Sequence, residues 1–360
     1  MRRAIEKAKG FGRSEAAPMH VSDATKAGRA RRWIAPSVLI LIVIASFCVG
    51  PYAIAPDDLV RSISSRALDR ASGLDPVAET VIWQIRLPRV LAALAIGAAL
   101  ASAGAAYQGL FRNPLVSPDI LGVTAGASLG AVLGIYFSLP VVVIQALAFG
   151  GGLFAVALVY LVGWTVRARD PMLVLVLAGV AIGALLGACV SLIKVLADPY
   201  NQLPAITYWL LGSLSAVTPG DLISVTPAIV LGLALLMLLR WRVNVMSLDD
   251  EEARALGLNT GVLRAVLIVG ATLLTAAAVS ISGVIGWIGL LTPHVARALV
   301  GADFGRLLPT SIMLGGGFLV GVDLIARSAA AIEIPLGVLT AVLGAPFFLY
   351  LLASTTRGWR

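Results

Sequence analysis

Charged side chains are scarce in this sequence. Asp, Glu, Lys and Arg make up 13% of its 360 residues, against about 25% in a typical soluble domain. Apolar residues reach 59%, and the mean hydropathy is +0.95. This balance excludes a cytosolic enzyme with a buried core. Cysteine is also rare: Cys48 and Cys189 both lie in apolar runs, which excludes a secreted disulfide scaffold and predicts two packed, unreactive thiols.

Motifs that bind nucleotides or metals are missing too. The chain has four lysines, none of which follows a glycine, so it lacks the GxxxxGK[ST] loop that cradles ATP phosphates. Its two histidines, His20 and His294, are far apart in the sequence, and no HExxH or paired-cysteine motif offers a metal site. The sequence therefore predicts a protein that is not an enzyme and that binds no cofactor or metal of its own.

What the sequence does have is a series of long apolar runs. A membrane-spanning helix needs about 20 predominantly apolar residues. Charge, proline and turn residues divide the chain into ten such runs, at about 34–50, 90–110, 118–138, 141–164, 172–196, 222–239, 262–281, 284–299, 308–326 and 336–353. The eighth is short, and residues 280–289 predict a broken or re-entrant turn. We expect an all-α polytopic membrane protein whose domain of about ten transmembrane helices covers residues 33–355.

Basic residues indicate how these helices are oriented. Nine of the 27 Lys and Arg residues fall within residues 1–32, a segment without apolar periodicity that we expect to be a disordered tail. With this tail in the cytoplasm and ten spans after it, twenty basic residues lie on the cytoplasmic side and seven on the other. The asymmetry predicts that both termini are cytoplasmic. Because the charge is gathered beside a membrane, the net charge of +8 does not indicate a nucleic-acid partner.

Glycines recur every four residues in two of the runs. The two sets are Gly122, Gly126, Gly130 and Gly134 in the third run, and Gly179, Gly183 and Gly187 in the fifth. This spacing places each set on one helix face, where missing side chains let neighbouring backbones approach closely. Helix packing is the favoured interpretation, and the lining of a path for a bulky solute is the alternative.

Ionisable residues inside the runs are few, although an ion-coupled transporter is expected to carry them at mid-membrane depth. Asp323 lies in the ninth run, but Arg327 follows four residues later and suits a local ion pair. Lys194, near the end of the fifth run, can extend its amine to the membrane surface. Ion-coupled secondary transport is therefore an alternative with little support in the sequence.

Three stretches carry ordered motifs. The first contains QIRLPR, GLFRNPL and DILG within residues 84–122, and the second is MSLDDEEARALGL at 246–258. The third begins at residue 286 and runs from GWIGLLTPHVARALVGADFGRLLP through GVDLIAR to EIPLGVLTAVLGAPFF. Together they resemble the permease subunits of type II ABC importers, the FecCD-like family that imports ferric siderophores, haem and cobalamin. The resemblance covers roughly residues 80–353.

The resemblance implies a subunit of the bacterial inner membrane that pairs with a second permease, identical or homologous, around one central path. Two cytosolic ATPase subunits would use ATP, which fits the missing phosphate-binding loop, and a periplasmic binding protein would deliver the substrate. A ferric siderophore or related iron chelate is the expected substrate. Haem and cobalamin are the alternatives.

Three arginines fall on the outer side, against the general bias of the charges: Arg86, Arg89 and Arg327. Anchoring at the membrane surface is the simple interpretation. The resemblance implies instead that they form a docking surface for acidic residues of the binding protein. Arginine suits that role because its planar fork binds a carboxylate with two hydrogen bonds.

The segment 246–258 is expected to be a cytoplasmic pair of short amphipathic helices. A solvated loop is the simple interpretation, whereas the resemblance implies that it couples the permease to the ATPase. The residues that match the family or that could dock into a groove are Asp250, Ala253, Arg254, Leu256 and Gly257.

A gate is expected at the inner ends of the second to fifth runs. Pro114 breaks a helix there, between Asn113 and Leu115, and Met172 follows a turn on the same side. We expect Asn113, Leu115 and Met172, with their symmetry mates, to narrow the path in the resting state.

Overall fold

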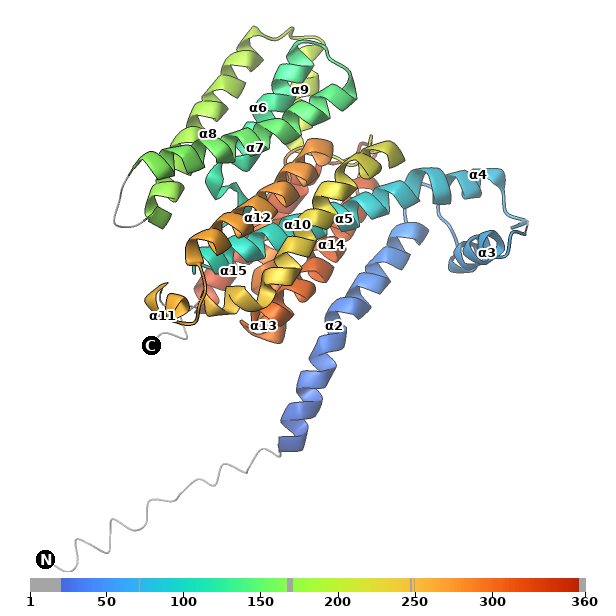
Figure 1. The fold of residues 1–360 in the computed structure, drawn as a ribbon. Coiled ribbons are helices and arrows are strands. Elements are labelled where there is room, and N and C mark those ends of the chain that lie inside the picture. Colours follow the sequence, from blue (N-terminus) through green and yellow to red (C-terminus); the bar gives the residue numbers. More distant parts are fainter. Residues whose placement is uncertain (1–20, 71, 167–170, 247, 249, 356–360) are drawn as a thin grey trace, which may run out of the picture.

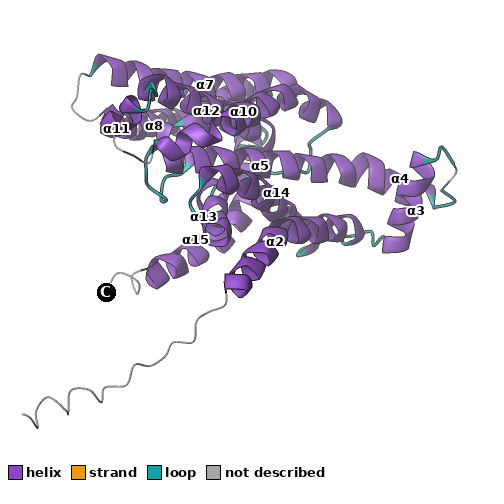
Figure 2. Ribbon diagram, turned by 60° about the horizontal axis from the view of Figure 1, so that its bottom comes forward, coloured by secondary structure: helices purple, strands orange, loops and turns teal. Residues whose placement is uncertain are grey.

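A computed structural model describes residues 21–70, 72–166, 171–246, 248 and 250–355 of the protein (Figure 1). Every regular element within these residues is a helix (Figure 2). The elements are α2 (Val21–Cys48), α3 (Pro56–Ala67), α4 (Pro76–Thr80), the π-helical turn η2 (Val81–Arg86), α5 (Leu87–Leu110), the 3₁₀ turn η3 (Pro118–Leu121), α6 (Val123–Tyr136), α7 (Val141–Thr165), α8 (Pro171–Leu196), α9 (Gln202–Leu211), α10 (Pro219–Val245), α11 (Asp250–Ala255), α12 (Thr260–Ser282), α13 (Ile288–Val300), α14 (Phe304–Ser328) and α15 (Leu336–Thr355).

The prediction of an all-α polytopic membrane protein is confirmed. Within the described residues, six stretches of helix are long and apolar enough to cross a membrane: Pro76–Leu110, α7, Met172–Leu196 of α8, α10, α12 and α14. Four shorter apolar helices complete the set: Trp33–Cys48 of α2, α6, α13 and Leu336–Tyr350 of α15. Each of the ten predicted runs thus forms an apolar helix.

The boundaries differ from the prediction at several places. Helix α2 begins at Val21, so residues 21–32, assigned to a disordered tail, are helical; Ala, Arg and Lys in this stretch are good helix formers. The third run opens with η3, and α6 starts only after Gly122, whose left-handed backbone (φ +74°) separates the two elements. The predicted broken turn lies at 283–287, between α12 and α13. The short helices α3 and α9 were not predicted.

Helix α5 lies at the centre of the bundle (Figures 1 and 2). It packs against α14, α12, α13 and α10, and its alanines and glycines are almost all buried. In lipid no hydrophobic force drives helices together, so they associate through close van der Waals packing. The small side chains of α5 permit that packing because they let the neighbouring backbones approach. The helix begins beside α4 and α3 and ends beside the connection to α11; we call these the α3 end and the α11 end of the bundle.

Two glycine crossings hold α5 against its neighbours. A Cβ atom built on Gly104 would lie 1.9 Å from the carbonyl oxygen of Gly289 on α13. One built on Gly97 would lie 2.2 Å from the carbonyl oxygen of Gly315 on α14. Both distances are far below van der Waals contact, so only glycine fits at these crossings.

Helices α6 to α9 form a second group beside the central bundle, in the upper part of Figure 1. The glycine stripe of α6 packs against α7, since a Cβ on Gly130 would lie 2.0 Å from the Leu147 carbonyl oxygen. The stripe of α8 behaves differently along its length. Gly179 is closed off by the Ile120 carbonyl oxygen at 2.1 Å, whereas Gly187 has nothing within 4 Å of its Cβ position. Packing is therefore the role of the α6 stripe, and the far half of the α8 stripe is open.

Candidate functional site

Three charged residues from distant parts of the chain meet at the α3 end. Arg89, in the first turn of α5, donates from Nε to Asp323 Oδ1 on α14 at 2.8 Å. Its terminal nitrogens donate to the two carboxylate oxygens of Glu333 at 2.7 and 3.0 Å, a bidentate arrangement. The side chains of Arg89 and Asp323 are 11% and 2% exposed. Protein charges, and not water, therefore compensate Arg89 and Asp323, because little water reaches either one.

Two further arginines at this end bind backbone carbonyls near the end of α2. Arg86, the last residue of η2, donates to the carbonyl oxygens of Phe47 and Tyr52. Arg327 donates to Ser46 Oγ at 2.9 Å and also to the Ser46 carbonyl oxygen. A guanidinium suits these positions because its five N–H groups can reach several acceptors at once. The two arginines thereby tie α5 and α14 to α2.

The three arginines predicted to dock a binding protein thus lie together, but inside the subunit. Arg86 and Arg327 are 4% and 8% exposed. Their docking role stays a prediction. The local pair expected between Asp323 and Arg327 is the longer contact, at 3.6 Å, and the shorter partner of Asp323 is Arg89. Sequence spacing could not identify Arg89, since 234 residues separate it from Asp323. Paired with two guanidiniums, Asp323 is not the isolated carboxylate that an ion-coupled carrier would use.

The predicted coupling segment, residues 246–258, lies at the α11 end. Its described residues, which leave out 247 and 249, form one short helix, α11, where a pair was expected. Ala253 is fully buried, whereas Arg254 and Leu256 are exposed, Leu256 to 65%. Gly257 has a left-handed backbone (φ +81°) just after the helix. Asp250 begins α11, and its side chain lies outside the described part of the structure. The segment therefore has one anchored side and one exposed side.

The predicted gate residues lie in two places, the loop between α5 and η3 and the start of α8. The turn η3 contacts both α5 and α8. Asn113 and Leu115 belong to residues 111–117, which join α5 to η3 and which we call the gate loop. The Asn113 side chain accepts a hydrogen bond from the Leu115 backbone N–H at 2.9 Å, so it shapes its own loop. Leu115 is 49% exposed. Met172, in the first turn of α8, is half-buried and packs against the main core.

A polar contact that the sequence did not reveal joins α5 to α13 beside the gate loop. Gln108 is 2% exposed and donates to the carbonyl oxygens of Gly289 and Leu290 at 3.3 and 3.2 Å. Its own oxygen accepts a hydrogen bond from Arg297 Nη2 at 3.2 Å. Gln108 and Arg297 line a cavity of about 570 Å³ at the α11 end. In the sequence, the sign of this contact was the position of Gln108, a single amide near the end of an apolar run. A buried polar group of that kind needs a hydrogen-bond partner.

A second contact closes the same end between α10 and α14. The Asn244 amide donates to Asp303 Oδ1 at 2.6 Å, and its oxygen accepts from the Phe304 N–H at 2.7 Å. This amide, helped by the Gly305 N–H, holds the pKa of the Asp303 carboxyl below its usual value. Asp303 also caps the start of α14. The beginning of α14 is thereby fixed to the end of α10.

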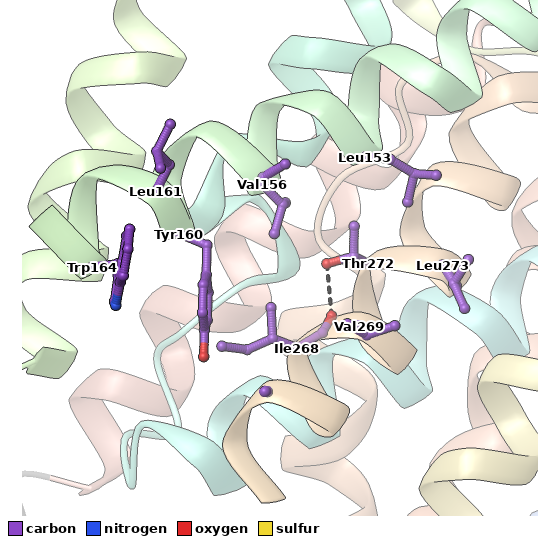
Figure 3. Close-up of a pocket in the computed structure, with 11 residues that line it drawn as sticks. Leu153, Val156, Tyr160, Leu161, Trp164, Ile268, Val269, Thr272 and Leu273 are labelled. Carbon is purple, nitrogen blue, oxygen red and sulfur yellow. Dashed lines mark hydrogen bonds between the residues drawn. The ribbon is translucent and has the colours of Figure 1, made fainter. Parts of the chain in front are cut away.

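An open groove of about 690 Å³ lies between α7 and α12 (Figure 3). Its walls are hydrocarbon and aromatic side chains, with Tyr160 and Trp164 toward one end. The Thr272 hydroxyl is already bound to the Ile268 carbonyl oxygen at 2.7 Å. The groove carries no charged side chain, so it offers contacts to hydrocarbon and not a polar path. Among the residues that the structure describes, no three His, Cys, Asp or Glu side chains are grouped so that they could hold a metal ion.

Comparison with known proteins places this architecture. The model of the FecCD transport family matches residues 38–354. The molybdate import system permease protein of Haemophilus influenzae is 39% identical over 89% of this chain and 94% of its own length. A probable iron chelatin transport system permease protein of Helicobacter pylori is 42% identical over 76% of this chain and 83% of its own length. Further relatives are permeases named for cobalamin, Fe(3+)-citrate and hemin.

A solved structure shares the fold. It is assigned to the metal-chelate type of ABC transporter, in an inward-facing conformation, and it superimposes with a TM-score of 0.81 at 36% identity, covering 91% of this chain and 99% of its own. Family model, relatives and fold agree over almost the whole chain. The protein is therefore a multi-pass permease subunit of the ABC-importer type, and it belongs to the FecCD transport family.

Proposed function

We propose that the subunit forms the translocation path for a ferric siderophore or a related iron chelate. The observation that carries this proposal is the likeness to a solved transporter of the metal-chelate type over 91% of the chain, together with the likeness to an iron chelatin permease over 76% of it. The open glycine face of α8 supports it, since missing side chains leave room for a bulky solute. Haem and cobalamin are the alternatives, and molybdate is a third because of the relative named for it.

The substrate is tested by presenting each candidate on the cognate binding protein. The permease, reconstituted in nanodiscs with its ATPase subunits, is titrated with that protein loaded with ferric siderophore, haemin, cobalamin or molybdate. We expect ATP hydrolysis to respond to the ferric siderophore form and not to the others. A response confined to one of the other three substrates would overturn the iron assignment.

In the same proposal the two ends of the bundle meet different partners. The binding protein sits at the α3 end, on the periplasmic side of a bacterial inner membrane. The buried Arg86, Arg89 and Arg327 fix the positions of the helices that form that surface. The two ATPase subunits sit at the α11 end, with both termini of the permease, and ATP is bound only there. A second permease, identical or homologous, completes the path.

The exposed side of α11 supports the ATPase contact. Combining Arg254→Glu with Leu256→Asp reverses a charge and inserts one on that side, and neither wild-type side chain is buried. We expect the variant to insert normally, to lose at least tenfold of its uptake, and to release the ATPase on affinity purification. The control, Arg61→Glu with Leu68→Asp, makes the same change on exposed residues at the α3 end. Equal ATPase retention by both variants would refute the coupling assignment.

The gate proposal concerns Asn113, Leu115 and Met172. Single cysteines at 113 or 172 are introduced after Cys48 and Cys189 are replaced by alanine. We expect a membrane-impermeant thiol reagent on the cytosolic side to label them in one nucleotide state and to fail in another, because the path narrows there. Labelling that is the same in all nucleotide states would remove these residues from the gate.

A further inference from the structure

The end of α5 has an unusual backbone. Arg112 takes the left-handed conformation, with φ at +49°. Its N–H donates to the Gly109 carbonyl oxygen at 3.3 Å, and the Asn113 N–H donates to the Gln108 carbonyl oxygen at 3.1 Å. This pair of bonds is the Schellman motif, in which the left-handed position is usually glycine. A residue with a Cβ atom is strained there. An arginine at this position therefore indicates that its side chain has a role that offsets the strain.

That side chain reaches the start of the coupling segment. Arg112 Nε donates to the Met246 carbonyl oxygen at 2.8 Å, and Nη2 donates to the Leu248 carbonyl oxygen. A guanidinium can bind two carbonyls in fixed directions, whereas the lysine ammonium is a single point charge on a flexible stem. The connection between α10 and α11 is thereby fastened through its backbone to the end of α5.

The residues that follow Arg112 make up most of the gate loop. Besides the Asn113 contact with Leu115, the Asn113 carbonyl oxygen accepts from the Val116 N–H at 3.3 Å. Gln108, one turn before Arg112, is fixed to α13 through two carbonyls. Arg112 thus lies where the coupling segment, the central helix and the gate loop meet.

We propose that Arg112 is the positioning residue that passes movement of the coupling segment to the gate loop. When the ATPase displaces Met246 and Leu248, the two guanidinium bonds pull on the residue immediately before Asn113. Without them the segment can move while the gate loop stays in place. This inference rests on the proposed function, because it requires an ATPase that moves the coupling segment.

The test is Arg112→Gly in proteoliposomes that contain the permease, its ATPase subunits and the loaded binding protein. Glycine removes both side-chain bonds to the coupling segment, and it also removes the strain of the left-handed backbone. Because these two effects oppose each other, thermal stability should not fall. We expect ATP hydrolysis within twofold of wild type and at least a tenfold loss of substrate moved per ATP. Arg112→Lys keeps the charge but not the two directed bonds. It should therefore also lose most of the substrate moved per ATP. Arg242→Gln, an exposed arginine in the last turn of α10, is the control and should keep the ratio.

Four results would overturn the inference. They are an unchanged transport ratio in Arg112→Gly, a fall in its thermal stability, loss of ATPase binding, and full rescue by Arg112→Lys. The first denies the link, the second makes Arg112 a structural anchor, the third makes it a direct ATPase contact, and the fourth shows that charge alone suffices. Failure of the proposed function would look different, because the wild-type complex itself would then show no transport driven by ATP.

Discussion

Replacing Arg89 with alanine is expected to lower the free energy of unfolding of the subunit by about 3–5 kcal/mol. The change removes the 2.8 Å partner of Asp323, whose side chain is 2% exposed. Arg327 remains at 3.6 Å, but it lies farther away and is held by Ser46. A buried carboxylate that loses its partner keeps its desolvation cost, so the loss is larger than that of an ordinary hydrogen bond.

The measurement is denaturant unfolding in detergent micelles, followed by circular dichroism. The control is Arg61→Ala, because the Arg61 and Asp57 side chains are 57% and 71% exposed and 3.8 Å apart; an exposed pair contributes at most about 1 kcal/mol. If the two variants lose the same stability, the buried cluster does not hold the helices together. A double-mutant cycle with Asp323→Ala should give a coupling energy of at least about 1 kcal/mol, since contacting residues are not additive.

The second large effect is expected at the crossing of α5 and α13. Gly104→Ala should destabilise the subunit by about 3 kcal/mol or more, since its Cβ would lie 1.9 Å from the Gly289 carbonyl oxygen and the overlap is with backbone, which cannot move aside. The matched control is Gly150→Ala on α7, where nothing lies within 4 Å of the Cβ position. There alanine should stabilise the helix by about 0.5–1 kcal/mol. The same unfolding assay measures both, and a loss of similar size in both variants would contradict the close crossing.

The periodicity and length of the apolar runs were enough to predict the helices. Ten runs predict ten apolar helices, and the α6 glycine stripe predicts close packing that the Gly130 contact confirms. Boundaries were less predictable where a single backbone angle decides them, as at Gly122. The short helices α3 and α9 escaped prediction because neither is long enough to span a membrane.

The site was predictable only in part. The topology derived from the charges located Arg86, Arg89 and Arg327 at one end, but it could not show that they are buried. Their partners are carbonyls and carboxylates far away in sequence, and local spacing carries no information on such contacts. The same holds for Arg112, whose acceptors lie 134 and 136 residues further along the chain. A residue other than glycine that takes the left-handed position at a helix end cannot be identified from a sequence. Only its backbone angle distinguishes it, and that angle is seen only in the structure.

The most direct test of the central claim is the rate of ATP hydrolysis and substrate uptake by this chain, with and without its ATPase subunits, in one reconstituted membrane. The account predicts that the permease alone neither hydrolyses ATP nor moves substrate. With the ATPase present, both activities should appear and should increase with the loaded binding protein. Uptake by the permease alone, driven by a proton or sodium gradient and unaffected by the ATPase, would contradict the account.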